Sequence, residues 1–197
     1  MPSRSRAGTG AASAGSPRYP LAMRGPLIVL VFVLGLLGAC RSGPLTAADR
    51  PEPALAAIQT ALEAVVARAD AERGVHWVHG WDGNDAVKES GEDGTVMGYC
   101  WHWQERVLAE MAAPVRAEGW DLVRININRG WFSEHHAVAV WDPERIDRDR
   151  ILREPRAPVW VLDPWLHGRP EIYALADWLA IPVIVFEPAG LEVPGSP

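Results

Sequence analysis

The stretch GYCWHWQERVLAEMAAPVRAEGWDLVRININ, residues 98–128, changes from a helical period to a strand period at one glycine. Apolar residues recur every three or four positions after Cys100, which predicts a helix over 100–118. After Gly119 the apolar residues alternate with polar ones, which predicts a half-buried strand over 120–128. A cysteine therefore stands in the first turn of a helix that leads directly into a strand.

The rest of the chain adds a helix before this stretch and strands after it. Apolar residues at helical spacing after Pro53 predict a helix that ends before Gly74. Short apolar runs predict strands over 136–141, 159–163 and 182–187, and helical spacing returns over 170–180. The segments between them, 80–98 and 142–158, are polar and are interpreted as a loop and a long exposed connection. Helices followed by strands indicate an α+β domain.

The N-terminal part has the features of an export signal. Residues 26–39 form the apolar run PLIVLVFVLGLLGA, which is shorter than the roughly 20 residues of a membrane span and ends at Cys40. The last four residues, LGAC, resemble the bacterial lipobox, and this resemblance implies a signal peptide over 1–40 with diacylglycerol on the sulfur of Cys40. Met23 offers an alternative start, since the sequence MRG followed by the apolar run has the short basic region of a signal.

Composition divides the chain after Cys40 into three segments, and its charge argues against two kinds of binding. Residues 41–54 have the Pro and Gly content of a tether, 55–188 form the expected domain, and 189–197 form a tail. Four of the 19 basic residues precede Cys40, which leaves 15 against 25 acidic residues, a net charge of −10. Such a charge argues against nucleic-acid binding and against electrostatic adhesion to anionic lipid. Membrane attachment at the cell envelope would therefore depend on the lipid at Cys40.

Cys100 is the chemically informative residue of the domain. With Cys40 acylated, Cys100 has no cysteine with which to form an internal disulfide. It is either a buried, inert thiol or a reactive one, and the start of a helix favours a thiolate. A thiolate nucleophile needs a base and a carboxylate that orients the base. His136 and Asp163 supply both on successive predicted strands.

Three segments resemble the transglutaminase-like superfamily of papain-type thiol enzymes. They are GYCWHW, HHAVAVW and WVLDPW, and the similarity extends over 98–165. The resemblance implies a cysteine-bearing helix packed on an antiparallel sheet that bears the histidine and the aspartate. It further implies a nucleophile at Cys100, a base at His136, an orienting acid at Asp163 and no cofactor. Val138 departs from the aromatic residue that family members often carry there, which leaves the subfamily and its substrate open.

Two adjacent histidines compete for the role of base. In a strand, His135 and His136 point to opposite faces, so only one of them can meet the cysteine. The pattern His-Ala-Val favours His136, and the alternative is a surface histidine beside a packed one. An oxyanion hole would use the backbone N–H of Cys100 and a second donor that the sequence does not identify.

Other aromatic and histidine residues have weaker signals. Trp101, Trp103 and Trp165 adjoin the predicted triad and are interpreted as a substrate groove, whereas the other seven tryptophans are assigned to the core or its rim. His76, His79 and His102 include an H-x-x-H pair. They lie in different predicted elements and lack a thiolate pair, so we predict no metal site.

The combined interpretation is a lipid-anchored protein of the bacterial cell envelope with a Cys-His-Asp thiol hydrolase or acyl transferase. It would act through a thioester on an amide of a peptide, a protein or the cell wall. Two alternatives stay open: an inactive binding module on the same fold, and a structural envelope lipoprotein with an inert Cys100. The reactivity of the thiol discriminates among the three.

Overall fold

The computed structural model describes residues 43–44, 52–91, 93–182 and 184–192. The contacts divide the chain into two units, Met1–Cys40 and Arg41–Pro197. The predicted signal peptide, its lipobox at Cys40 and most of the predicted tether lie outside the described residues. The architecture below is that of the second unit.

The centre of this unit is a five-stranded sheet in the order β6-β5-β4-β3-β7. All neighbouring strands are antiparallel, which confirms an α+β domain with an antiparallel sheet. The long strands β3 and β4 are joined by a short connection and pair along their whole length, from Asp121 with Trp141 to Ile127 with His135. The strands are β3 (Asp121–Ile127), β4 (His135–Trp141), β5 (Val159–Leu162), β6 (Ile172–Ala174) and β7 (Gly190–Leu191).

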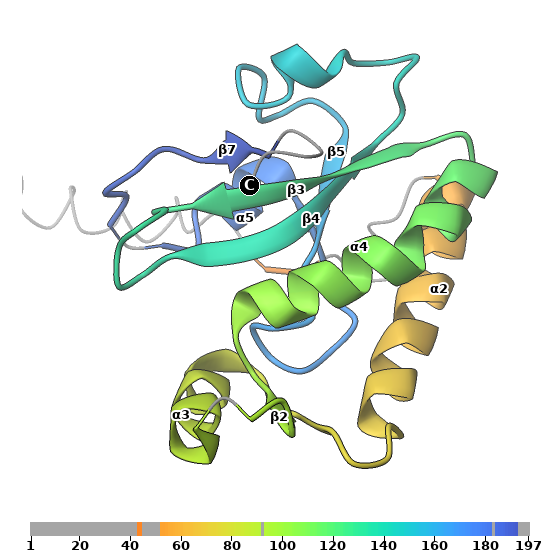
Figure 1. Cartoon of the computed structure of the whole chain (residues 1–197). Helices are drawn as coiled ribbons and strands as arrows, with labels where there is room; N and C mark the ends of the chain where they lie inside the picture. Colours follow the sequence, from red (N-terminus) through yellow and green to blue (C-terminus); the bar gives the residue numbers. More distant parts are fainter. Residues whose placement is uncertain (1–42, 45–51, 92, 183, 193–197) are drawn as a thin grey trace, which may run out of the picture. The chain divides into compact units, whose positions relative to one another are not determined.

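Two long helices, α2 (Pro53–Asp70) and α4 (Cys100–Ala117), form one layer of the unit. Figure 1 shows α4 lying along β3 and β4, with α2 beside it. The apolar residues that repeat along α4, such as Val107 and Met111, are fully buried against Val138 and Val140 of β4. The apolar residues that predicted this helix are therefore the ones that contact the sheet.

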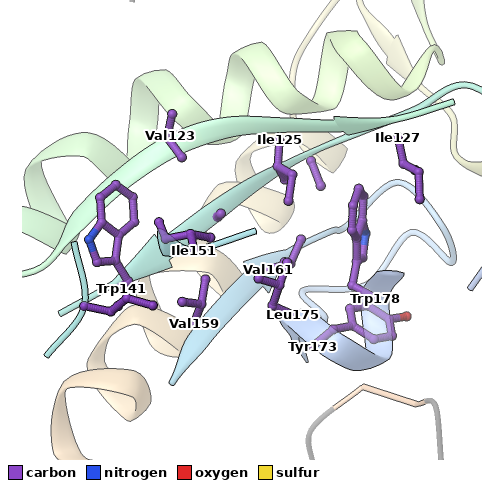
Figure 2. Packing of buried hydrophobic residues seen from close by; sticks show 13 residues of the cluster. Val123, Ile125, Ile127, Trp141, Ile151, Val159, Val161, Tyr173, Leu175 and Trp178 are labelled. Atoms are coloured by element: carbon purple, nitrogen blue, oxygen red, sulfur yellow. The ribbon is translucent and has the colours of Figure 1, made fainter. Parts of the chain in front are cut away.

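A second apolar layer covers the opposite face of the sheet, as Figure 2 shows. Val123, Ile125 and Ile127 of β3 point into this layer, as their alternation predicted. It is closed by the short helix α5 (Leu175–Leu179) and by Ile151 from the connection between β4 and β5. That connection was predicted to be exposed, but its Ile146 and Ile151 are buried because they pack against this apolar face of the sheet.

The predicted loop over 80–98 contains an unexpected helix, α3 (Gly80–Ser90). Glycine, aspartate and asparagine are poor helix formers, so local preference concealed it. A buried Val87, and Gly91 in the left-handed conformation at φ 73° after its end, hold the helix in place. Two short strands flank it, β1 (His76–Trp77) and β2 (Val96–Met97), and they pair in parallel.

The C-terminal predictions are also corrected. The helix expected over 170–180 is divided into β6 and α5, because β5 offers an edge for residues 172–174 to pair with. The strand expected over 182–187 is absent from the described residues of that range. Instead β7, inside the predicted tail, pairs with β3 at Ile125 and Asn126. The domain therefore extends past residue 188.

The helix α3 meets the segment before Cys100 through two glycines. A Cβ atom on Gly98 would lie 2.3 Å from the backbone oxygen of Gly83, and one on Gly83 would lie 2.5 Å from that of Gly98. Such distances leave no room for a side chain on either residue, since backbone atoms have little freedom to move. The close approach of two main chains fixes the position of the segment that enters α4.

We predict that Gly98→Ala lowers the free energy of unfolding by about 1 to 3 kcal/mol, because the added methyl group overpacks a backbone contact. Urea unfolding followed by circular dichroism measures the change. Gly43→Ala is the matched control, since a Cβ atom there meets nothing within 4 Å. Equal stability of the two variants would contradict the close contact.

Candidate active site

Cys100 is the first residue of α4 and is 7% exposed. The turn that holds it is closed by His102, whose Nδ1 accepts hydrogen bonds from the backbone N–H groups of Gly98 (3.1 Å) and Tyr99 (3.3 Å). The sulfur lies 3.9 Å from the backbone oxygen of Glu134, the residue that precedes β4. The start of the cysteine helix therefore reaches the end of the sheet where β4 begins.

His135 and Asp163 meet at this same end. Antiparallel pairing of Val138 with Leu162 brings the first residue of β4 close to the residue that follows β5. His135 Nε2 lies 2.6 Å from Asp163 Oδ2, and both side chains are buried. A carboxylate oxygen accepts hydrogen bonds, so Nε2 carries the proton in this contact and Nδ1 faces the rest of the site.

Two tryptophans enclose this pair. The ring of His135 contacts both Trp165 and Trp178, with ring centroids 4.9 Å and 5.4 Å away. Trp178 Nε1 donates a 2.8 Å hydrogen bond to the same Asp163 oxygen that His135 contacts. The aspartate is therefore held by a second donor, which fixes the plane of the imidazole.

The electrostatic state of His135 follows from its neighbours. Burial by itself lowers the pKa of the imidazole, but the negative charge of Asp163, its hydrogen bond and the adjacent Cys100 sulfur outweigh burial and raise the pKa to about 10. Nδ1 of His135 makes no hydrogen bond of ordinary geometry within the described part of the chain. The imidazole is thus protonated at neutral pH and lies beside the sulfur of Cys100.

His136 does not take part in this arrangement, and the prediction that it is the partner of Cys100 is wrong. Its Nε2 lies 2.6 Å from Glu134 Oε1 and its Nδ1 lies 3.4 Å from Gln104 Oε1. Gln104 belongs to α4, so His136 does point to the helix-covered face, as its alternation implied. Cys100, however, lies at the end of the strand rather than over its helix-covered face. There it is next to His135, whose side chain belongs to the other face of the sheet.

The three tryptophans predicted to form a groove lie in different surroundings. Trp103 is buried, packs against Trp77 and donates to the backbone oxygen of Val78, so it lines no groove. Trp101 is 48% exposed and lies beside Tyr99, at a different hollow from that of His135. Trp165 is beside His135, as expected of a site residue.

A hollow of about 330 Å³ opens beside His135 and Trp165. Its other walls come from the connection between β3 and β4, from α3 and from the segment that follows α5. A volume of this order is typical of a site for a small ligand or a side chain. The site therefore has an open approach next to the imidazole.

Of the three histidines considered for a metal site, His79 and His102 have other contacts. His102 Nδ1 is engaged by the backbone at the start of α4. His79 packs against Gly168, where a Cβ atom would lie 2.5 Å from its Nδ1. Within the described ranges, no group of three or more His, Cys, Asp or Glu side chains is arranged to hold a metal ion.

Besides His135, sequence reasoning missed Trp178, which contacts the site, and Asn128, which anchors the loops beside it. Trp178 was assigned to packing, and no local pattern marks its contact with Asp163. Asn128 follows β3 and is fully buried with its amide group bonded to two loops. A polar residue at the end of an alternating strand is a weak signal for such an anchor.

We predict a pH dependence of stability in a Cys100→Ser background, in which no thiol titrates at this site. In this background the charge and the hydrogen bond of Asp163 still raise the pKa of His135, although the contribution of Cys100 is removed. The stabilising contribution of His135 is therefore complete below about 6.5, the ordinary value, and is lost as pH rises through the raised pKa of the folded state. Urea unfolding at pH 6.5, 8 and 9.5 should show this decline. Adding Asp163→Asn should flatten it, and equal slopes with and without Asp163 would contradict the buried pair.

The described part of the chain has no helix long and apolar enough to cross a membrane. Comparison with known proteins yields no match to a family model, to a curated protein or to a solved structure.

Proposed function

We propose that the domain is a transglutaminase-like thiol enzyme in which Cys100 attacks an amide and holds the acyl group as a thioester. The arrangement that supports this is a cysteine-bearing helix on an antiparallel sheet that carries His135 and, after the next strand, Asp163. The order of these residues along the chain is the order of the family's triad, with His135 in place of His136.

One observation carries the proposal: a buried His135 between a carboxylate and a thiol. Burying a charged pair is costly and is seldom needed for stability, because apolar residues of similar volume serve the fold as well. A strongly raised pKa at the wall of an open hollow is a frequent property of catalytic groups.

In the first half of the reaction, the thiolate of Cys100 attacks the carbonyl carbon and the carbonyl electrons move to oxygen. The backbone N–H of Cys100 supplies one donor to that oxygen. His135 gives its Nδ1 proton to the leaving nitrogen as the C–N bond breaks, which releases an amine and leaves a thioester. Asp163 holds the Nε2 proton throughout and stabilises the imidazolium.

In the second half, the neutral imidazole of His135 removes a proton from the acceptor, which attacks the thioester. Collapse of this adduct expels the thiolate and restores the starting pair. Water as acceptor gives hydrolysis, and an amine gives acyl transfer. The substrate is an amide of a peptide, a protein or the cell wall, and the chemistry needs no cofactor.

We further propose that the protein is exported and anchored to the bacterial envelope by lipid on Cys40. The apolar run before Cys40 and the LGAC sequence support this placement. A net charge of −10 after Cys40 gives the domain no electrostatic attraction to anionic lipid. The anchor would hold the enzyme near substrates of the envelope.

The thiol's reactivity tests the catalytic proposal. In the full chain carrying Cys40→Ser, Cys100 is the only cysteine, so iodoacetamide labelling reports on it alone. We predict alkylation at pH 6 about tenfold faster than that of glutathione, because the imidazolium of His135 favours the thiolate. His135→Ala should remove this advantage.

The matched control is His136→Ala, which removes the same side chain one residue away and should change the rate less than about twofold. Loss of reactivity in His136→Ala but not in His135→Ala would contradict the assignment of the base. A slow wild-type rate that neither variant changes would favour an inert thiol in a binding or structural protein.

The anchor is tested separately by Cys40→Ser in cells that process lipoproteins. Labelled palmitate should be incorporated into the wild type and not into the variant. The variant should also lose most of its membrane association, because one lipid-bearing residue supplies the attachment. Equal recovery of both forms in the membrane fraction would contradict this proposal.

A further inference from the structure

Large apolar side chains are exposed around the hollow beside His135. In the described parts of the chain, seven large hydrophobic residues are exposed, and four of them line this hollow: Trp81, Phe132, Ile184 and Phe186. Their exposed fractions range from 36% to 78%. Exposed apolar residues gathered at one place on a monomer usually mark a binding site.

These side chains have a defined arrangement. Phe186 stacks on Trp131, with ring centroids 4.5 Å apart and an angle of 12° between the planes. Phe132 meets the edge of Phe186 at 5.5 Å. Trp81 of α3, which also lines the hollow, packs edge-on against Trp165 at 6.2 Å. The aromatic groups thus form walls before any ligand arrives, which reduces the entropy cost of binding.

Asn128 holds together the two loops that make one side of the hollow. Its Oδ1 accepts hydrogen bonds from the backbone N–H groups of Phe186 (2.7 Å) and Glu187 (3.1 Å). Its Nδ2 donates to the backbone oxygen of Ile184 (3.0 Å) and to Oγ of Ser133 (2.9 Å). The amide group is therefore fully used between the loops.

The backbone of Asn128 is also unusual. Its φ of 58° is left-handed, and it is the one such residue other than glycine in the described ranges. Asparagine tolerates this conformation better than most residues, but the conformation still carries strain. A strained, buried asparagine whose contacts all lead to the loops of one hollow indicates that their position matters.

The lining offers no free positive charge to an anionic occupant, because the imidazolium of His135 is already paired with Asp163. Among the described residues that line the hollow there is no lysine or arginine. Besides His135 the charged residue of the lining is Glu134, and its two carboxylate oxygens are engaged by His136 and by the backbone N–H of Gly130. The lining therefore suits an uncharged apolar group.

We propose that this hollow binds a large apolar side chain of the acyl donor, a peptide-type amide, and that Asn128 is the residue that positions its loops. The inference rests on the proposed function, because the hollow is continuous with His135 and with Glu134, whose backbone oxygen lies 3.9 Å from the Cys100 sulfur. A peptide amide presents a side chain next to the carbonyl that the thiol attacks. Binding of the apolar side chain in the hollow would therefore place the adjacent carbonyl group near the thiol.

The test uses N-acetylated amino-acid chloromethyl ketones of phenylalanine, leucine, alanine and glutamate on the full chain carrying Cys40→Ser. Each alkylation rate is divided by the rate of the same reagent with glutathione, which removes intrinsic reactivity. The phenylalanine and leucine reagents should react about tenfold faster than the alanine reagent, with the glutamate reagent slowest. Iodoacetamide, which has no side chain, reports the thiol's own reactivity.

Variants then separate the hollow from the thiol. Phe186→Ser and Asn128→Ala should bring the phenylalanine-to-alanine ratio towards one, while the iodoacetamide rate changes less than about twofold. Asn128→Gly relieves the backbone but lacks the amide, and should also lose the preference, whereas Asn128→Asp keeps the acceptor and should retain part of it. Trp101→Ser is the matched control, since Trp101 is also an exposed aromatic residue but lies at another hollow.

The outcomes distinguish this inference from the proposed function. A ratio near one with fast, His135-dependent iodoacetamide labelling would overturn the apolar subsite and leave the catalytic proposal standing. A tenfold ratio with slow iodoacetamide labelling would support the subsite and contradict the catalytic role. A ratio near one, together with phosphatidylcholine-vesicle binding that Phe186→Ser abolishes, would overturn the subsite in favour of a lipid-facing surface.

Discussion

The contact between His135 and Asp163 places the strongest constraint on this domain. An imidazolium and a carboxylate 2.6 Å apart are removed from water at the end of the sheet, and each needs partners to offset its lost hydration. Trp178 supplies an N–H to the carboxylate, and its ring covers one side of the imidazole. The order β5-β4 in the sheet is what allows two residues 28 positions apart to share this space.

Trp165 connects this pair to the cysteine. Its ring lies against His135, its Nε1 donates a 2.6 Å hydrogen bond to the backbone oxygen of Gly98, and its own backbone oxygen accepts from Gly80. One residue therefore contacts the histidine, the segment before Cys100 and the start of α3. Since Gly98 also packs closely on Gly83, the distance between thiol and imidazole is set by rigid main-chain contacts rather than by surface side chains.

The apolar hollow is built in the same way, from segments outside the regular elements that a buried residue fixes. Asn128 fixes the loops at Phe186 and Ser133 by hydrogen bonds, just as Trp165 fixes the turn before Cys100. Loops positioned by a rigid scaffold are a common place for specificity, because they change without disturbing the core. The proposed chemistry and the proposed selectivity thus depend on different anchors, which lets single substitutions separate them.

Periodicity in the sequence by itself determined α2, α4 and the central strands, because each buries one face and a buried face leaves an apolar repeat. It also marked Cys100 at a helix start and Asp163 as the last residue of a predicted strand. Only the tertiary structure decided between His135 and His136: alternation assigns them to opposite faces, but it does not say that the thiol meets the strand beyond its end. Likewise α3 and β7 exist because Gly98 and β3 offer them partners, and a partner distant in sequence leaves no local pattern.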